Sequence, residues 1–254
     1  MLAWTCAPTS DSAMLAVPTE PATLRTTAHA RPRAAAGAQP FPWLVPGVFL
    51  GSLTPLASIA LRTTRGGLDA NPIAQIENEL GLAALIFLVA SLACTPLRRV
   101  TRWTWPVRIR RELGLFAFFY AGVHVLVYLL VDQGLDVTAV VADIVKRPFI
   151  TVGFLALVLM VPLAVTSTRA SVRRLGFRRW QRLHQLAYLA GVLGVVHFIW
   201  RVKSDISQPL VYACALGVLL GLRAVFWFFE RRRPAVRPRA TSAGPIGRAR
   251  ANRS

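Results

Sequence analysis

The sequence predicts an all-α membrane protein, a bundle of six transmembrane helices, and three observations support this class. Hydrophobic residues make up 54% of the chain and charged residues only 16%, which leaves too few polar positions for a soluble domain. Six apolar runs reach about the 20 residues that an α-helix needs to cross a bilayer. Arginine clusters lie at the ends of these runs, so the formal net charge of +19 indicates membrane orientation rather than nucleic-acid binding.

The six predicted spans follow one another between residues 42 and 229. Pro46 and Pro55 fall inside the first run, so we expect its helix to be kinked or shortened. The flanking segments 1–40 and 230–254 are predicted to be disordered cytoplasmic extensions of a transmembrane domain at 41–229. The predicted spans are 42–61, 80–97, 113–131, 149–166, 181–200 and 209–229.

Arginine residues are concentrated in alternate connections between the spans. The three rich segments are 98–111, 169–179 and 231–233, and six spans place all three on one side of the membrane. The connections on the other side carry few cations or balance them with acidic residues. The positive-inside rule therefore predicts that both termini are cytoplasmic.

Three histidines lie within the predicted spans, and a histidine in hydrocarbon is a functional-site hypothesis by default. His124 in the third span and His197 in the fifth lie about 20 and 22 Å above the cytoplasmic edge at the helical rise of 1.5 Å per residue. At one level on two helices, their imidazoles can hold one haem iron from its two faces. His184 lies near the cytoplasmic edge and would belong to a second, inner site, for which the sequence gives no second ligand.

The geometry of the fifth span limits how these sites are arranged. Thirteen residues at 100° each place His184 and His197 about 140° apart around an ideal helix. Either two haems lie on different sides of this helix, or the helix is kinked.

The surroundings of His124 and His197 allow two interpretations. Small residues beside them leave room for a flat macrocycle or serve plain helix packing. Tyr120 and Tyr128 could hydrogen-bond haem or histidine, or anchor the helix at the interface. Arg223 could pair with a haem propionate or a phosphate, or extend to the interface. The small residues are Ala121, Gly122, Gly191 and Gly194.

Other classes of site and protein fit less well. A zinc or copper site needs further His, Cys, Asp or Glu ligands at one level, and the cores of these spans offer none. A proton-coupled transporter is expected to carry carboxylates inside its spans, so a transporter or scaffold with incidental histidines is disfavoured. The three cysteines, Cys6, Cys94 and Cys214, suggest no disulfide framework.

Six segments in fixed order carry a specific likeness to a known family. They are TPLRR (95–99), RRELGLFAFFYAGVHVLVY (110–128), DIVKRPFITVG (143–153), PLAVTSTRA (162–170), RRLGFRRWQRLHQLAYLA (173–190) and HFIWRVK (197–203). Together they resemble the haem-binding membrane subunits of the periplasmic protein-methionine-sulfoxide reductase system, which belong with the ferric-reductase-like transmembrane proteins. The likeness covers about residues 41–225.

The resemblance implies a six-helix cytochrome b of the bacterial inner membrane that binds haem b and FMN. Such a subunit takes electrons from the quinone pool or a cytoplasmic flavin reductase. It passes them to a periplasmic molybdopterin subunit that reduces methionine sulfoxide in damaged proteins. The haem histidines of the family correspond to His124, His184 and His197.

The chain is therefore expected to be an electron-transfer subunit rather than the catalytic one. It carries no GxGxxG loop for a nicotinamide or flavin dinucleotide, so its electrons must come from a quinol or an external flavoprotein. The alternative in the same class is a ferric-reductase-like subunit that serves another acceptor, such as a metal ion.

Overall fold

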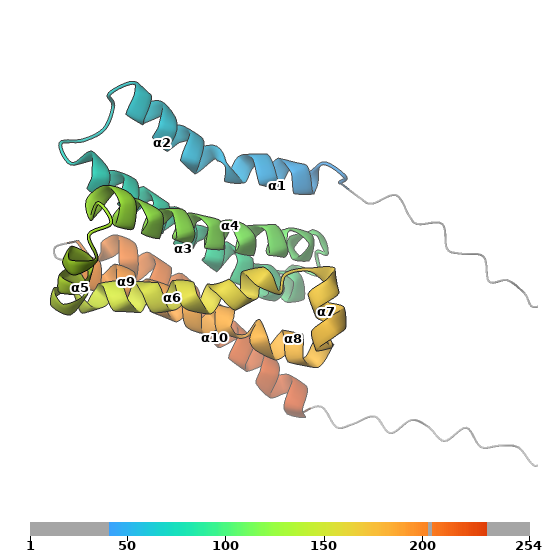
Figure 1. Ribbon diagram of the computed structural model, residues 1–254. Coiled ribbons are helices and arrows are strands. Elements are labelled where there is room, and N and C mark those ends of the chain that lie inside the picture. The colour runs from blue at the N-terminus through green and yellow to red at the C-terminus, as the bar shows by residue number, and fades with distance from the viewer. Residues whose placement is uncertain (1–40, 203–204, 233–254) are drawn as a thin grey trace, which may run out of the picture. The chain divides into compact units, whose positions relative to one another are not determined.

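The computed structural model describes residues 41–202 and 205–232, and every regular element in this part of the chain is a helix (Figure 1). Six helical segments there are long and apolar enough to cross a membrane, so the predicted all-α fold with six spans is confirmed. The predicted extension at 1–40 and most of the predicted tail lie outside the described residues. The tail was predicted to begin at residue 230, but the last helix continues to Arg232.

The first predicted span consists of two helices, α1 (Leu44–Ser52) and α2 (Thr54–Thr64), which meet at Leu53. Pro55 lies in the first turn of α2 and has no backbone N–H to donate to Gly51, so the hydroxyl of Thr54 donates to the Gly51 carbonyl instead, at 2.7 Å. The expected proline break is therefore present.

The hydroxyl of Tyr120 stabilises this break from a neighbouring span. It donates to the carbonyl of Ser52 at 2.7 Å and accepts from the backbone N–H of Leu56 at 3.3 Å. These are the two groups that would bond each other in an unbroken helix, so the hydroxyl is inserted between them. Tyr120 is fully buried.

The second and third spans are longer than their apolar runs. Helix α3 (Pro72–Thr101) begins with Asn71 as N-cap, whose side chain accepts from the N–H of Ala74, and ends at Arg102 in the left-handed conformation. Helix α4 (Trp105–Val127) continues as a π-helix, η1 (Tyr128–Asp132). Hydropathy marks only the apolar part of a helix, so the predicted spans began at residues 80 and 113. Glu77 and Glu112, which precede them, lie on α3 and α4 in the structure.

The fifth span is interrupted at its first histidine. Helix α8 (Phe177–Leu183) ends before His184, and helix α9 (Leu186–Arg201) begins two residues after it. His184 and His197 therefore do not share one regular helix, which is the kinked alternative of the two that the sequence left open.

The remaining helices complete the order of elements. The fourth span is α6 (Pro148–Val165), the short α7 (Arg169–Leu175) precedes α8, and the sixth span is α10 (Ser207–Arg232). Helix α5 (Val137–Lys146), capped by the side chain of Asp136, occupies a connection that the sequence reading treated as a loop.

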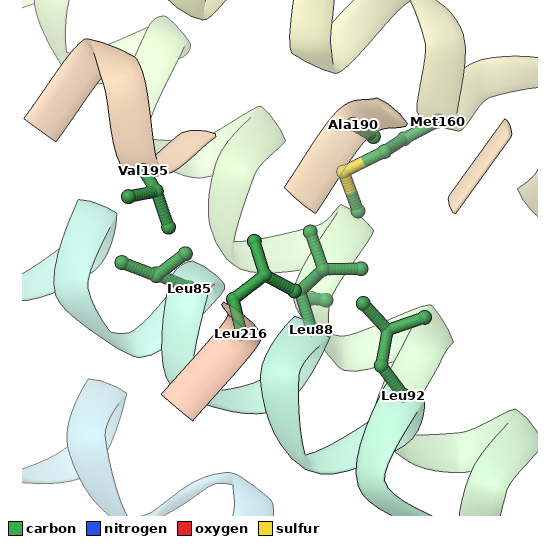
Figure 2. Close-up of a cluster of buried hydrophobic side chains, with 8 residues drawn as sticks. Leu85, Leu88, Leu92, Met160, Ala190, Val195 and Leu216 are labelled. Carbon is green, nitrogen blue, oxygen red and sulfur yellow. The ribbon is translucent and has the colours of Figure 1, made fainter. Parts of the chain in front are cut away.

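The main core lies between α3, α4, α6, α9 and α10. Figure 2 shows buried side chains from four of these helices meeting there, and α3 packs along α4 as α6 packs along α9 (Figure 1). A second cluster joins α2 to α3 and α4 around Tyr120. The labelled core residues in Figure 2 are Leu85, Leu88, Leu92, Met160, Ala190, Val195 and Leu216.

Candidate cofactor site

A cavity of about 830 Å³ lies between α3, α4, α5, α6 and α9. This volume is within the range of roughly 300–1,000 Å³ that is usual for ligand and cofactor sites. His124 and His197 both line the cavity, and its deeper wall is formed by apolar core residues such as Leu88 and Met160. The structure therefore brings together two of the three histidines that the sequence singled out.

The imidazoles of His124 on α4 and His197 on α9 lie beside each other. Their ring centres are 6.3 Å apart, and the ring planes are inclined by 78°. The prediction that these two side chains lie at one level is confirmed. An imidazole nitrogen binds a transition metal at about 2 Å, so two imidazoles on opposite sides of one metal have ring centres about 6 Å apart.

Each of these imidazoles is fixed by one hydrogen bond from its Nδ1 atom to a backbone carbonyl. Nδ1 of His124 donates to the carbonyl of Glu77 on α3 at 2.9 Å, and Nδ1 of His197 donates to that of Phe149 on α6 at 2.7 Å. A carbonyl oxygen only accepts, so Nδ1 carries the proton in both rings. Nε2 of each ring then keeps its lone pair for a metal, as is usual for ligating histidines.

A glycine follows each acceptor carbonyl by four residues and allows the imidazole to approach. A Cβ on Gly81, four after Glu77, would lie 3.4 Å from Cε1 of His124. A Cβ on Gly153, four after Phe149, would lie 2.6 Å from Nδ1 of His197. Each histidine is thus bound to an opposing helix in the same way, by a backbone carbonyl and a glycine one turn later. The sequence analysis singled out neither glycine.

The rim of the cavity is polar. Arg201 donates to the side chain of Asn78, and Glu77 and Asp132 also line this end. Helix α5 covers part of the cavity with Val140 and Ile144. Two cations, Arg147 and Arg201, lie at the rim.

Helix α5 is fixed to the cavity through one carboxylate. Asp143 accepts from the hydroxyl of Tyr128 at 3.1 Å and pairs with Arg147 at 3.0 Å. Tyr128 lines the cavity, but its hydroxyl donates to Asp143 rather than to a histidine. A connection that the sequence reading took for a loop thus forms one wall of the site.

The small residues expected near the histidines divide into two groups. Ala121 and Gly194 line the cavity, which agrees with the first interpretation. Gly191 instead packs against Leu92 and Leu216, because a Cβ there would lie 3.3 Å from the Leu92 side chain. Gly122 has no side chain within 4 Å of such a Cβ and does not line the cavity.

Two other polar residues singled out in the sequence are used elsewhere. The hydroxyl of Tyr120 bonds the α1–α2 junction, so the first of its two interpretations, a bond to haem or histidine, is not what the structure shows. Arg223 lies over the ring of Tyr188, 4.4 Å from its centre, which is a cation–π contact.

His184 does not line this cavity. Its Nε2 lies 3.2 Å from the hydroxyl of Thr166, and its ring lies 4.1 Å from that of Trp180. Trp180 in turn donates its indole N–H to the carbonyl of Thr166 at 2.9 Å. His184 is therefore held at the other end of α9 from His197, as its predicted depth requires.

His124 and His197 fit a haem, whose iron these two residues would hold. Two unprotonated Nε2 atoms, a cavity of cofactor size, apolar deeper walls and cations at the rim are the features that a haem with two propionates needs. Among residues 41–202 and 205–232 there is no group of three or more His, Cys, Asp or Glu that could hold a bare metal ion.

Comparison with known proteins gives consistent matches over most of the chain. Residues 80–195 match the family described as "Ferric reductase like transmembrane component". Three similar proteins bear the name "Protein-methionine-sulfoxide reductase heme-binding subunit MsrQ". The one from Rhodospirillum rubrum is 52% identical over 198 residues, which is 78% of this chain and 91% of that protein.

The other two matches have similar extent. The protein from Ralstonia nicotianae is 50% identical over 188 residues, covering 73% of this chain and 86% of its own length. The protein from Deinococcus radiodurans is 49% identical over 180 residues, covering 71% and 89%.

Proposed function

Because the chain belongs to the MsrQ family of heme-binding subunits of protein-methionine-sulfoxide reductases, we propose that it binds haem b and carries electrons across the bacterial inner membrane. Its acceptor in this proposal is a periplasmic molybdopterin-containing methionine-sulfoxide reductase, which repairs oxidised proteins. The donor is the quinone pool or a cytoplasmic flavin reductase.

One observation carries this proposal: two imidazoles from different helices lie with their ring centres 6.3 Å apart, and both Nδ1 protons are bonded to backbone carbonyls. These bonds leave Nε2 of His124 and Nε2 of His197 unprotonated, so these two residues would hold the iron of one haem. When bound, the haem iron supplies reversible one-electron chemistry between its ferric and ferrous states. The protein's part is to fix the orientation of the two imidazoles and to exclude water from the apolar, deeper part of the cavity.

We assign His184 to a second, inner haem, with Nε2 as the ligand atom. Nε2 is the ring nitrogen that meets the Thr166 hydroxyl, so this proposal requires the hydroxyl to yield that position. Two haem levels would divide the crossing into shorter electron-transfer steps. FMN is the second cofactor of the proposal, and the arginines of α7 and α8 are the candidates for binding its phosphate.

The distribution of charge supports an orientation with both termini in the cytoplasm. Arginines follow α3, surround α7 and α8, and end α10, all at the end of the bundle opposite to the His124–His197 cavity. The outer haem would then lie near the periplasmic face, where the acceptor is in reach.

The experiment begins with the absorption spectrum of the purified full-length protein. We expect a Soret band and the sharp α-band of a low-spin haem with two imidazole ligands, and a protein without Soret absorption would end the proposal.

The family description also favours a second candidate function, reduction of ferric ion. A bacterial strain that lacks this gene separates the two, with wild type and His197→Ala as complementing copies. Repair of oxidised methionine in the periplasm that is restored by wild type alone supports the first function. Restored ferric reduction without restored repair would favour the second.

A further inference from the structure

The carboxylate of Asp143 on α5 has a different partner at each of its two oxygen atoms. Oδ2 accepts from the hydroxyl of Tyr128 at 3.1 Å, and Oδ1 pairs with Nε of Arg147 at 3.0 Å. Only 12% of the Asp143 side chain is exposed, so solvent screens these contacts little. Both partners line the histidine cavity, whereas Asp143 does not. Asp143 therefore acts on the cavity through Tyr128 and Arg147.

Tyr128 belongs to the span that carries His124. It follows His124 by four residues, which is about one helical turn, and both side chains line the cavity. Tyr128 is also the first residue of the π-helix η1, a rare conformation that is frequently found at functional sites. The hydroxyl of Tyr128 thus attaches the C-terminal end of this span to α5.

Arg147 lies at the corner between α5 and α6. Its backbone N–H donates to the carbonyl of Asp143 at 2.8 Å, and it is the N-cap of α6, which begins at Pro148. A residue before proline is biased away from the helical conformation, so α5 ends at this corner. Two residues after Arg147, the carbonyl of Phe149 accepts the hydrogen bond from Nδ1 of His197. The pair with Asp143 thus attaches the start of α6 to α5.

The two histidines of the cavity belong to separate pairs of helices. His124 on α4 is bound to a carbonyl of α3, and α3 packs along α4. His197 on α9 is bound to a carbonyl of α6, and α6 packs along α9. The cavity lies between these pairs. Each hydrogen bond therefore fixes one ring within its own pair, and neither bond fixes one ring relative to the other.

Asp143 joins the two pairs beside the cavity. Its bond to Tyr128 reaches the pair of α3 and α4, and its contact with Arg147 reaches the pair of α6 and α9. Figure 1 shows α5, which carries Asp143, at the end of the bundle where α6 begins. One carboxylate thus connects the parts of the chain that hold the two imidazoles.

We propose that Asp143 is a positioning residue, which fixes the spacing and the angle between the imidazoles of His124 and His197. The inference rests on the proposed function, because it concerns how the site would hold its haem. In the structure the ring centres are 6.3 Å apart and the ring planes are inclined by 78°. Without the Asp143 contacts, the two helix pairs can separate at the mouth of the cavity, which weakens the hold on the iron.

The test compares variants of the full-length haem-loaded protein in lipid nanodiscs. Asp143→Ala removes both contacts, and Tyr128→Phe removes one hydroxyl group. Asp136→Ala is the matched control, because this acid caps the start of the same helix and does not line the cavity. The rate of haem transfer to excess apomyoglobin is followed by Soret absorbance.

We expect Asp143→Ala to release haem roughly tenfold faster or more, as the loss of a hydrogen bond to a charged group predicts. Tyr128→Phe should have a smaller effect in the same direction. Adding Tyr128→Phe to Asp143→Ala should change the rate no further, because the partner of the hydroxyl is already gone. Asp136→Ala should release haem at the wild-type rate. Equal rates in Asp143→Ala and Asp136→Ala, or wild-type rates in both Asp143→Ala and Tyr128→Phe, would overturn the proposal.

A spectroscopic measurement separates positioning from general stability. The largest g value in the electron paramagnetic resonance spectrum of the ferric protein depends on the angle between the imidazoles that bind the iron. This g value should shift in Asp143→Ala and stay unchanged in Asp136→Ala. If Asp143→Ala retains no haem, Tyr128→Phe provides the shifted spectrum. A wild-type g value in the variants that lack an Asp143 contact would overturn the proposal.

A distance measurement on the polypeptide distinguishes failure of this proposal from failure of the proposed function. Spin labels at Leu126→Cys on α4 and Leu155→Cys on α6, both exposed positions, report the spacing of the two helix pairs by double electron–electron resonance. The native cysteines are replaced by serine, and any haem is kept in its diamagnetic ferrous state. The distances should be narrowly distributed in wild type and Asp136→Ala and broadly in Asp143→Ala. A wild type without haem would end the proposed function, and an equally narrow distribution in Asp143→Ala would end this proposal.

Discussion

Gly153 of α6 lies against the imidazole of His197, so closely that a Cβ on it would stand 2.6 Å from Nδ1. The same Nδ1 donates to the carbonyl of Phe149, one helical turn earlier. The glycine therefore makes room for the bond that sets the tautomer of the histidine. His124 has the same relationship with Gly81 and Glu77, at slightly longer distances.

We predict that Gly153→Ala displaces His197 and weakens haem binding roughly 10- to 100-fold, the usual effect of losing a ligand's supporting contact. Real Cβ atoms do not approach other atoms to 2.6 Å, so the ring must move and the Phe149 bond must break. The measurement is haem content per protein from the Soret absorbance of the purified variant.

Two further glycines calibrate this prediction. Gly81→Ala should have a smaller effect, because its Cβ would meet His124 at 3.4 Å. Gly217→Ala on α10 should leave haem content unchanged, since nothing lies within 4 Å of its Cβ. Equal haem loss in Gly217→Ala and Gly153→Ala would show that disturbed helix packing, and not the contact of Gly153 with His197, causes the loss of haem.

The histidines should give separable spectra. We predict that His124→Ala and His197→Ala each abolish the same low-spin haem, because one iron needs both Nε2 atoms. His184→Ala should leave that haem in place and remove only the inner component. Potentiometric titration followed at the α-band measures this, and a wild-type titration curve in His184→Ala would contradict the assignment of an inner haem.

The sequence was sufficient to predict the six spans and the meeting of His124 with His197. Both predictions depend on local quantities, the length of apolar runs and the fixed rise of a helix. Both predictions hold although the helices are longer than the apolar runs. The depth of each histidine was counted from the residue at which its helix enters the membrane, and this count does not depend on the length of the helix.

The hydrogen bond that fixes each histidine, and the glycine beside it, could not be predicted in this way. The acceptor atoms are backbone carbonyls of Glu77 and Phe149, and a backbone carbonyl leaves no mark in the sequence. The only signal in the sequence is one glycine in each of the two helices that pack against the histidine-bearing helices, Gly81 of α3 and Gly153 of α6. Glycines in membrane helices have many uses, so this signal is not specific. The break at His184 also lacked a signal, because neither proline nor glycine accompanies it.

Tyr120→Phe should destabilise the protein by about 1–3 kcal/mol, since it leaves two backbone groups at the α1–α2 junction without their partner. Tyr212→Phe is the matched control, because no hydrogen bond of its hydroxyl is found in the described part of the chain. Unfolding in mixed micelles with increasing dodecyl sulfate measures the difference. Equal stability of the two variants would mean that Ser52 and Leu56 bond each other once the hydroxyl is gone.

The orientation can be tested with reporter fusions to the full chain. A green fluorescent protein after Ser254 should fluoresce, because it folds in the cytoplasm. Alkaline phosphatase fused after Val140 in α5 should be active, because that connection is predicted to face the periplasm. The opposite pair of results would invert the topology and place the His124–His197 cavity at the cytoplasmic face.

Arg201 should raise the reduction potential of the outer haem. Its guanidinium lies at the rim of the histidine cavity, and a positive charge there disfavours the ferric state, which carries one more positive charge than the ferrous state. Arg201→Gln should therefore lower the midpoint potential by tens of millivolts, at roughly 60 mV for each 1.4 kcal/mol in a one-electron step. Arg201→Lys should retain most of the potential because it keeps the charge. Arg65→Gln, an exposed arginine that does not line the cavity, should leave the potential unchanged. If Arg201→Gln and Arg201→Lys lower the potential equally, the hydrogen bond to Asn78, and not the charge, sets the potential.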